Sequence, residues 1–158
     1  SWAIDILAEN NYVYDSSIVP AKTSMYGLPN AEHKPYRITS ESIEKNDSSG
    51  KIIEFPLLTT TFLGKKIPAA GGFYLRSLPT KIIKNAFKNY QNKGIPGSFY
   101  IHSWELTPEF MPKLDLPFKD KFTTYHNLGK AYSRMKELLK NFEFTSFERF
   151  LTKYNFQN

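Results

Sequence analysis

The strongest periodicity in the chain lies in residues 79–93. Apolar side chains recur there on one helical face and mostly lysines occupy the other, so the segment predicts an amphipathic helix. Pro79 suits the first turn of this helix, and Gly94 suits its end. Short apolar runs typical of strands lie on both sides, at 73–75 and 98–102. A strong helix between short strands favours an α/β arrangement.

Further elements are predicted from the same patterns: helices over 2–9, 128–140 and from Thr145 onward, and strands over 12–14 and 51–55. Thr145 and Glu148 have the spacing of a capping box, and 20–50 is predicted to be mostly loop. The strands are too few for a closed barrel, and an incomplete sheet leaves an open edge. We therefore expect residues 1–158 to be one portion of an α/β domain whose other half is missing.

The composition narrows the classes of function. The 158 residues include no cysteine, which excludes disulfide bonds and thiolate metal sites. The net charge is +6, but 17 of the 21 basic residues are scattered lysines and only four are arginines. Nucleic-acid sites usually concentrate basic side chains on one face, so we expect no nucleic-acid partner. No apolar run reaches the roughly 20 residues that span a bilayer, so we expect no membrane span either.

His102 is the first candidate for chemistry. If 98–102 is a strand, Tyr100 and His102 share one face, and His102 ends the strand where α/β barrels place catalytic groups. Trp104 and Glu105 follow directly. A histidine can act as a general acid because its ordinary pKa lies near working pH. The alternative, a hydrogen-bonded structural histidine at a strand end, stays open on the residues alone.

Two further segments carry polar groups at positions suited to a site. Asp15 ends the strand over 12–14, where it could orient a histidine or pair with an arginine, or simply cap a turn. Gly71 and Gly72 allow positive φ or close approach to a ligand, and Tyr74 and Arg76 alternate onto one face of the strand predicted after them. The alternative for this second segment is a tight turn with a surface arginine.

A metal centre held by this chain is not expected. Zinc sites usually need three protein ligands, and His33, His102 and His126 stand alone in the sequence, without a partner at ligand spacing. Glu54 lies inside the apolar strand over 51–55, where an alternating pattern turns it to solvent; an inward orientation would require a partner.

Six segments in this order resemble one known family: WAIDILAENNYVYDSS, YGLPNA, IIEFPLLT, the Gly-Gly-Phe-Tyr-Leu-Arg-x-Leu-Pro stretch at 71–79, FYIHSWEL and YHNLGKAYSRMKELLKNFEF. The sequence is similar to the C-terminal half of polysaccharide deacetylases of carbohydrate esterase family four, the NodB-homology hydrolases. The nearest subgroup is the one associated with exopolysaccharide and exosortase gene clusters, which carries a C-terminal extension.

The resemblance implies a fold and a chemistry. The fold would be the C-terminal part of a distorted (β/α) barrel, and the reaction a metal-dependent removal of N-acetyl groups from the amino sugars of a polysaccharide. Phe99 to His102 is similar to the family's late Leu-x-x-His motif, which makes His102 the general acid for the leaving amine. Asp15 falls near the aspartate motif that tunes the site. The resemblance further suggests a group of substrate-binding residues, Tyr74, Arg76, Trp104 and Glu105.

The departures from the family concern its N-terminal half. The family's catalytic-base aspartate, its two metal-binding histidines and its arginine-proline motif precede the segment that Ser1 begins. We therefore expect a divalent metal, zinc by resemblance, in the full-length protein, and an inactive chain when this portion stands alone. The expected partners are an N-acetylated polysaccharide or oligosaccharide and the missing N-terminal half. The alternative is a non-catalytic carbohydrate-binding or scaffold domain; the compartment stays open between cytoplasm and cell envelope of a bacterium or archaeon.

Overall fold

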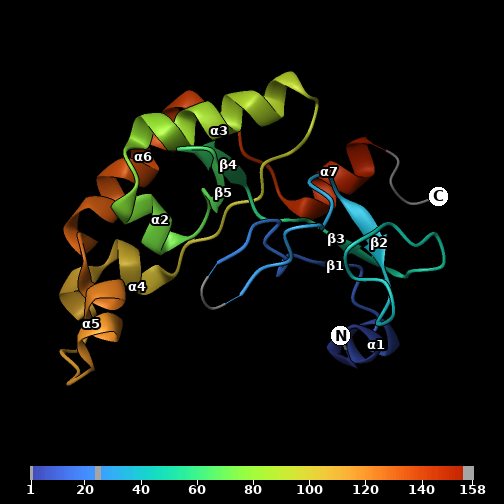
Figure 1. Ribbon diagram of the computed structural model, residues 1–158, viewed down its shortest axis with the longest axis horizontal. Helices are drawn as coiled ribbons and strands as arrows, with labels where there is room; N and C mark the ends of the chain where they lie inside the picture. Colours follow the sequence, from blue (N-terminus) through green and yellow to red (C-terminus); the bar gives the residue numbers. More distant parts are fainter. Residues whose placement is uncertain (1, 24–25, 155–158) are drawn as a thin grey trace.

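The computed structural model describes residues 2–23 and 26–154 and shows a mixed α/β fold (Figure 1). Its helices are α1 (Trp2–Glu9), α2 (Gly72–Ser77), α3 (Thr80–Asn92), α4 (Ser103–Leu106), α5 (Phe118–Tyr125), α6 (Ala131–Asn141) and α7 (Phe147–Lys153), with 3-10 turns η1 (Pro108–Phe110) and η2 (Leu128–Lys130). Its strands are β1 (Tyr14–Asp15), β2 (Tyr36–Ile38), β3 (Ile52–Glu54), β4 (Thr59–Phe62) and β5 (Lys65–Pro68). No helix in the described ranges is long and apolar enough to cross a membrane.

The strands form two small sheets. In the first, β3 lies in the middle, parallel to β1 and antiparallel to β2. The second is the antiparallel hairpin β4–β5, whose turn residues Leu63 and Gly64 have φ values of 49° and 74°. Figure 1 shows the first sheet with α1 and α7 in one half of the molecule, and the hairpin with α2 to α6 in the other.

Buried apolar clusters lie in both halves, two in the half with the first sheet and a larger one in the other. Phe55, which follows β3, stacks on Phe147 of α7 with ring centroids 4.3 Å apart. In the other half, Ile83 and Phe87 on the apolar face of α3 pack with Leu58 and Leu138. Leu138 belongs to α6, so this helix and α3 enclose the larger cluster between them.

The segment after β3 connects the two halves. The amide of Leu57 donates to the carbonyl of Ile18 at 2.9 Å, and the amide of Leu58 donates to the carbonyl of Ser98 at 3.0 Å. Residues near 18, 57 and 98 therefore lie side by side, although they are far apart in the sequence.

Several sequence predictions are confirmed by the structure. The helix over 2–9 has the predicted bounds, the helix over 79–93 is α3, and the helix over 128–140 corresponds to η2 and α6. The strand over 51–55 is β3. The α/β barrel remains a prediction, because small open sheets are compatible with a part of such a barrel and with other folds.

Other predictions are wrong. Residues 73–75 lie in helix α2, and 98–102 is extended but forms only an isolated bridge between Leu57 and Ser98. The segment over 20–50 is mostly loop, as predicted, and its described residues include one short strand, β2. The cap of α7 is Ser146, whose hydroxyl accepts from the Arg149 amide, so Thr145 is not the capping residue. Local sequence patterns do not specify the exact residue that caps a helix, nor whether an extended segment finds a neighbouring strand to pair with.

Candidate functional site

His102 lies at the start of helix α4 with an exposed ring. This position differs from the predicted strand end, because residue 102 is the N-cap of a four-residue helix. Its ring is stacked nearly parallel on that of Trp104, with centroids 5.7 Å apart and 10° between the planes. The Tyr100 ring meets it edge-on at 5.5 Å. The imidazole is thus held in an aromatic group while remaining open to solvent.

The backbone of His102 is held by Glu105. The Glu105 Oε2 atom accepts a hydrogen bond from the His102 amide at 3.1 Å. This is the glutamate half of a capping box, in which the third helical residue satisfies the free amide at the helix start. Glu105 is only 1% exposed, so its carboxylate faces the protein interior.

Arg76 and Glu105 form a buried ion pair. Their Nε and Oε1 atoms are 2.9 Å apart, and both side chains are 2% exposed. The remaining guanidinium nitrogens of Arg76 donate to two backbone carbonyls, those of Thr123 and His126. The sequence suggested that Arg76 and Glu105 bind substrate. In the structure both side chains lie in the interior and are bonded to protein groups rather than facing solvent.

The two glycines before Arg76 make room for this arrangement. Gly71 has a φ of 92°, and a Cβ there would lie 2.9 Å from the Tyr100 ring. A Cβ on Gly72 would lie 1.6 Å from Glu105 Oε2, so only glycine leaves space for the carboxylate. The expectation of close approach at this motif is thus met by protein groups, the Tyr100 ring and the Glu105 carboxylate.

Tyr74 and Arg76 do not share a face as predicted. In helix α2, residues two positions apart point in nearly opposite directions, so Arg76 is buried whereas Tyr74 is half-buried. Burial, together with the nearby hydroxyls of Tyr26 and Tyr100, raises the pKa of Tyr74 to about 12. The Tyr74 hydroxyl therefore lies near those of Tyr26 and Tyr100, and the Tyr100 ring in turn contacts His102.

A hollow of about 340 Å³ lies beside this group, where the two halves of the molecule meet. It is lined by Ser16, Ser17, Ile18, Val19, Tyr26, Gly27, Leu28, Leu57 and Tyr100. Tyr100 belongs to both places, since its ring lines the hollow and contacts His102. The hydroxyls and aromatic rings at its wall are groups that contact sugars through hydrogen bonds and ring faces.

Asp15 and Glu54 are bonded to two residues that line the hollow, Ser17 and Ile18. Asp15 accepts a hydrogen bond from the Ser17 hydroxyl and lies opposite Glu54 in the β1–β3 register. Glu54 is completely buried, so the prediction that it faces solvent is wrong: both faces of β3 are covered. Its Oε1 atom accepts from the Ile18 amide at 2.9 Å. Burial, and then the neighbouring Asp15 carboxylate, raise the pKa of Glu54 to about 8.

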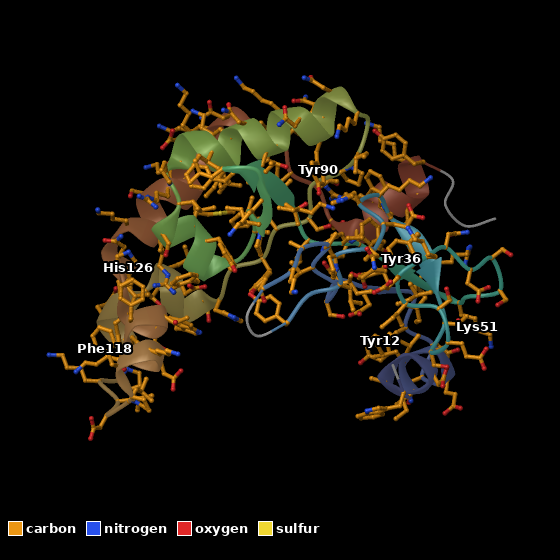
Figure 2. All side chains as sticks on the ribbon, in the orientation of Figure 1. Tyr12, Tyr36, Lys51, Tyr90, Phe118 and His126 are labelled. Atoms are coloured by element: carbon orange, nitrogen blue, oxygen red, sulfur yellow. The ribbon has the colours of Figure 1, made fainter. Side chains whose placement is uncertain are left out.

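The structure does not bring the three histidines together. His33 Nδ1 lies 3.0 Å from the Tyr90 hydroxyl, and burial followed by the charge of Lys66 lowers the pKa of His33. His126 stacks on Phe122 in the α5 half, and Figure 2 shows it far from Tyr12 and Lys51. Within residues 2–23 and 26–154, no group of three or more His, Asp or Glu side chains could hold a metal ion.

Sequence reasoning missed two parts of this region. Arg134 on α6 donates from Nη1 to the carbonyls of Leu75, Arg76 and Leu78 at 2.7, 2.8 and 2.9 Å, which fixes the end of α2. Nothing near Arg134 in the sequence indicates this role. The second part is the burial of Glu54, which could have been suspected from its position inside an apolar strand.

The fold and the site together define a mixed α/β domain that presents an exposed, aromatic-flanked histidine beside a small hollow. Residues 16–152 match the family model described as Domain of unknown function (DUF3473), so the chain belongs to that family. This domain is found at the C-terminus of exopolysaccharide-associated polysaccharide deacetylases. No curated protein and no solved structure shows significant similarity to the chain.

Proposed function

We propose that this domain is the C-terminal part of a polysaccharide deacetylase that removes N-acetyl groups from amino sugars of an exopolysaccharide. One observation carries the proposal: the imidazole of His102 is open to solvent, while its ring and its backbone are both held by neighbouring groups. A general acid needs this combination, because it must reach the substrate in a fixed orientation.

In the proposed reaction, His102 acts on the leaving group. The amide C–N bond of the acetamide breaks after water adds to the carbonyl carbon, and the protonated imidazole gives its proton to the departing amine nitrogen. The carbonyl carbon leaves as acetate. The described residues supply no metal ligand set, so the zinc of the resemblance would be held by residues outside this chain. The proton transfer from His102 is proposed without reference to the position of that zinc.

The test is steady-state kinetics of the full-length protein with His102→Ala. On an N-acetylated oligosaccharide, kcat should fall by about 10²–10⁴-fold, the usual contribution of general acid–base catalysis, with KM little changed. An activated acetate ester, whose leaving group needs no proton, should be affected much less. His33→Ala is the matched control, since this histidine contacts Tyr90 and none of the groups that hold His102.

Two results would contradict the assignment. A near-normal kcat on the acetamide means that His102 is structural. Loss of bound zinc together with activity means that His102 is a ligand rather than an acid. Zinc content is therefore measured in every variant.

A second function is favoured by the exposed rings of Tyr26 and Tyr100, which are 48% and 42% exposed at the wall of the hollow. Such rings suit a carbohydrate-binding domain without chemistry. In that case Tyr100→Ala should abolish binding of the oligosaccharide by the full-length protein, and His102→Ala should leave all its activities unchanged.

A further inference from the structure

We infer that Arg76 and Glu105 are positioning residues for His102, which rests on the function proposed above. Neither side chain reaches solvent. Glu105 nevertheless contacts the backbone of His102. Arg76 contacts Trp104, the residue on whose ring the His102 imidazole stacks.

The first connection runs through the carboxylate of Glu105. Its Oε1 atom accepts from Arg76 Nε at 2.9 Å, and its Oε2 atom accepts from the His102 amide at 3.1 Å. Both partners are N–H donors, so both oxygens must be acceptors. Only a carboxylate meets this requirement; a glutamine amide has one accepting oxygen and would lose one of the two bonds.

The second connection runs through Trp104. The Arg76 guanidinium carbon lies 6.0 Å from the centroid of the Trp104 ring, within the range of a cation–π contact. The same indole stacks on the His102 ring at 5.7 Å. Displacement of Arg76 therefore changes both the backbone and the ring surroundings of His102.

Arg76 is itself fixed from two other elements. Its Nη2 atom donates to the Thr123 carbonyl at 3.0 Å, and Nη1 donates to the carbonyl of His126. Arg134 holds the carbonyl of Arg76 from α6 at 2.8 Å. A buried ion pair contributes little net stability compared with an apolar pair of similar volume. This pair instead fixes the positions of the groups that are bonded to it.

Gly72→Ala tests the inference with the smallest change. The added Cβ would overlap Glu105 Oε2, whereas a Cβ on Gly129 in η2 meets nothing within 4 Å, so Gly129→Ala is the matched control. In the full-length protein, Gly72→Ala should lower kcat by about 10–100-fold with KM nearly unchanged, since small misplacement of a catalytic group can cost about 10²-fold. Gly129→Ala should behave like the wild type.

A double-variant cycle separates positioning from general damage. In a His102→Ala background, Gly72→Ala should cause no further loss of kcat, because the group that it displaces is gone. An equal loss in both backgrounds would overturn the inference. If Gly72→Ala does not fold, Glu105→Gln takes its place, as it keeps the size of the side chain and removes one acceptor.

A readout without activity keeps the inference independent of the proposed function. In histidine-labelled full-length protein, the His102 ring protons should carry an upfield ring-current shift from Trp104, assigned by its loss in His102→Ala. Gly72→Ala and Glu105→Gln should reduce this shift, and Gly129→Ala should retain it. Unchanged ring shifts together with unchanged kcat would overturn the inference. If the shift falls in both variants but His102→Ala keeps full activity, the positioning holds and the proposed function fails.

Discussion

Asp15 and Glu54 lie directly opposite each other on the parallel strands β1 and β3. One of the two carboxyl groups, that of Glu54, is completely buried, and its Oε2 atom has no hydrogen-bond partner within the described residues. A buried carboxylate beside a second carboxylate is unfavourable, so the proton on Glu54 is retained to higher pH.

This proton makes the stability of the domain depend on pH. The pKa of Glu54 is raised from its ordinary value near 4.5 to about 8, so the folded state binds a proton that the unfolded state releases over this interval. The free energy of unfolding should therefore fall as pH rises from 4.5 to 8, by up to about 4 kcal/mol. Glu54→Gln, which mimics the protonated form, should flatten this dependence and be the more stable protein at pH 8. Urea unfolding across that range measures it, with the exposed Glu143→Gln as control; parallel slopes in Glu54→Gln and wild type would exclude Glu54 as the cause.

Arg134 should be a major source of stability in the α2–α6 half. Its Nη1 atom serves three carbonyls that no other described side chain except Asn127 contacts. Arg134→Ala should cost about 2–4 kcal/mol of unfolding free energy, because these partly buried carbonyls lose a charged donor. Arg134→Lys should recover part of it. Chemical denaturation checks this, with the exposed Arg149→Ala as control; a loss equal to that of the control would show that water replaces the guanidinium.

The turn between β4 and β5 offers a stabilising substitution. Leu63 has a φ of 49° and is 86% exposed. Its left-handed backbone is unfavourable for leucine, and burial of its side chain does not offset that cost. Asn-Gly is the preferred pair for such hairpin turns. Leu63→Asn should raise the free energy of unfolding by about 0.5–1 kcal/mol, visible as a higher Tm. Leu114→Asn, at another exposed leucine, should give no such gain.

The chain of residues 1–158 should bind no stoichiometric zinc. His33, His102 and His126 have separate surroundings, and the described residues contain no group suited to a metal. Elemental analysis after zinc addition and dialysis measures this. One tightly held zinc per chain would show that these histidines can converge.

The same chain should self-associate or be marginally stable. Trp2 of α1 is 74% exposed, and the adjoining Tyr12 and Val13 before the edge strand β1 are 58% and 49% exposed. Exposed apolar groups beside an open strand edge favour association. Size exclusion with thermal melting tests it, and Val13→Lys should reduce the associated fraction. A monodisperse monomer with a sharp, high transition would refute the expectation.

How much of this could be predicted depends on the range of the contacts involved. The helix α3 follows from its own periodicity, because its apolar face packs on one cluster throughout. Arg76 could not be placed from the sequence, since its partner Glu105 is 29 residues away and an arginine after a glycine pair is typical of a surface turn. Residues 98–102 alternate like a strand but bridge to a neighbour only at Ser98 among the described residues, so the pattern lacked the hydrogen-bonding partner that makes a strand.

The candidate site shows the same division. The sequence singled out His102 as a candidate but did not predict that its ring is exposed, and its contact with Trp104 depends on the helical turn that follows residue 102. A strand continued through residue 104 would have turned those two side chains to the same face at a greater separation.

The choice of acceptors around Arg76 has a consequence for how relatives of this domain can diverge. Two of its bonds end on the backbone carbonyls of Thr123 and His126, and every amino acid supplies a carbonyl, so these positions can drift without loss of the contacts. Glu105 bonds to Arg76 through its side chain, and Gly72 leaves the space that this side chain occupies. Neither position can change independently of Arg76. In relatives that have lost His102, substitutions at these three positions should be tolerated together. Their joint variation would identify the relatives in which the histidine has no function.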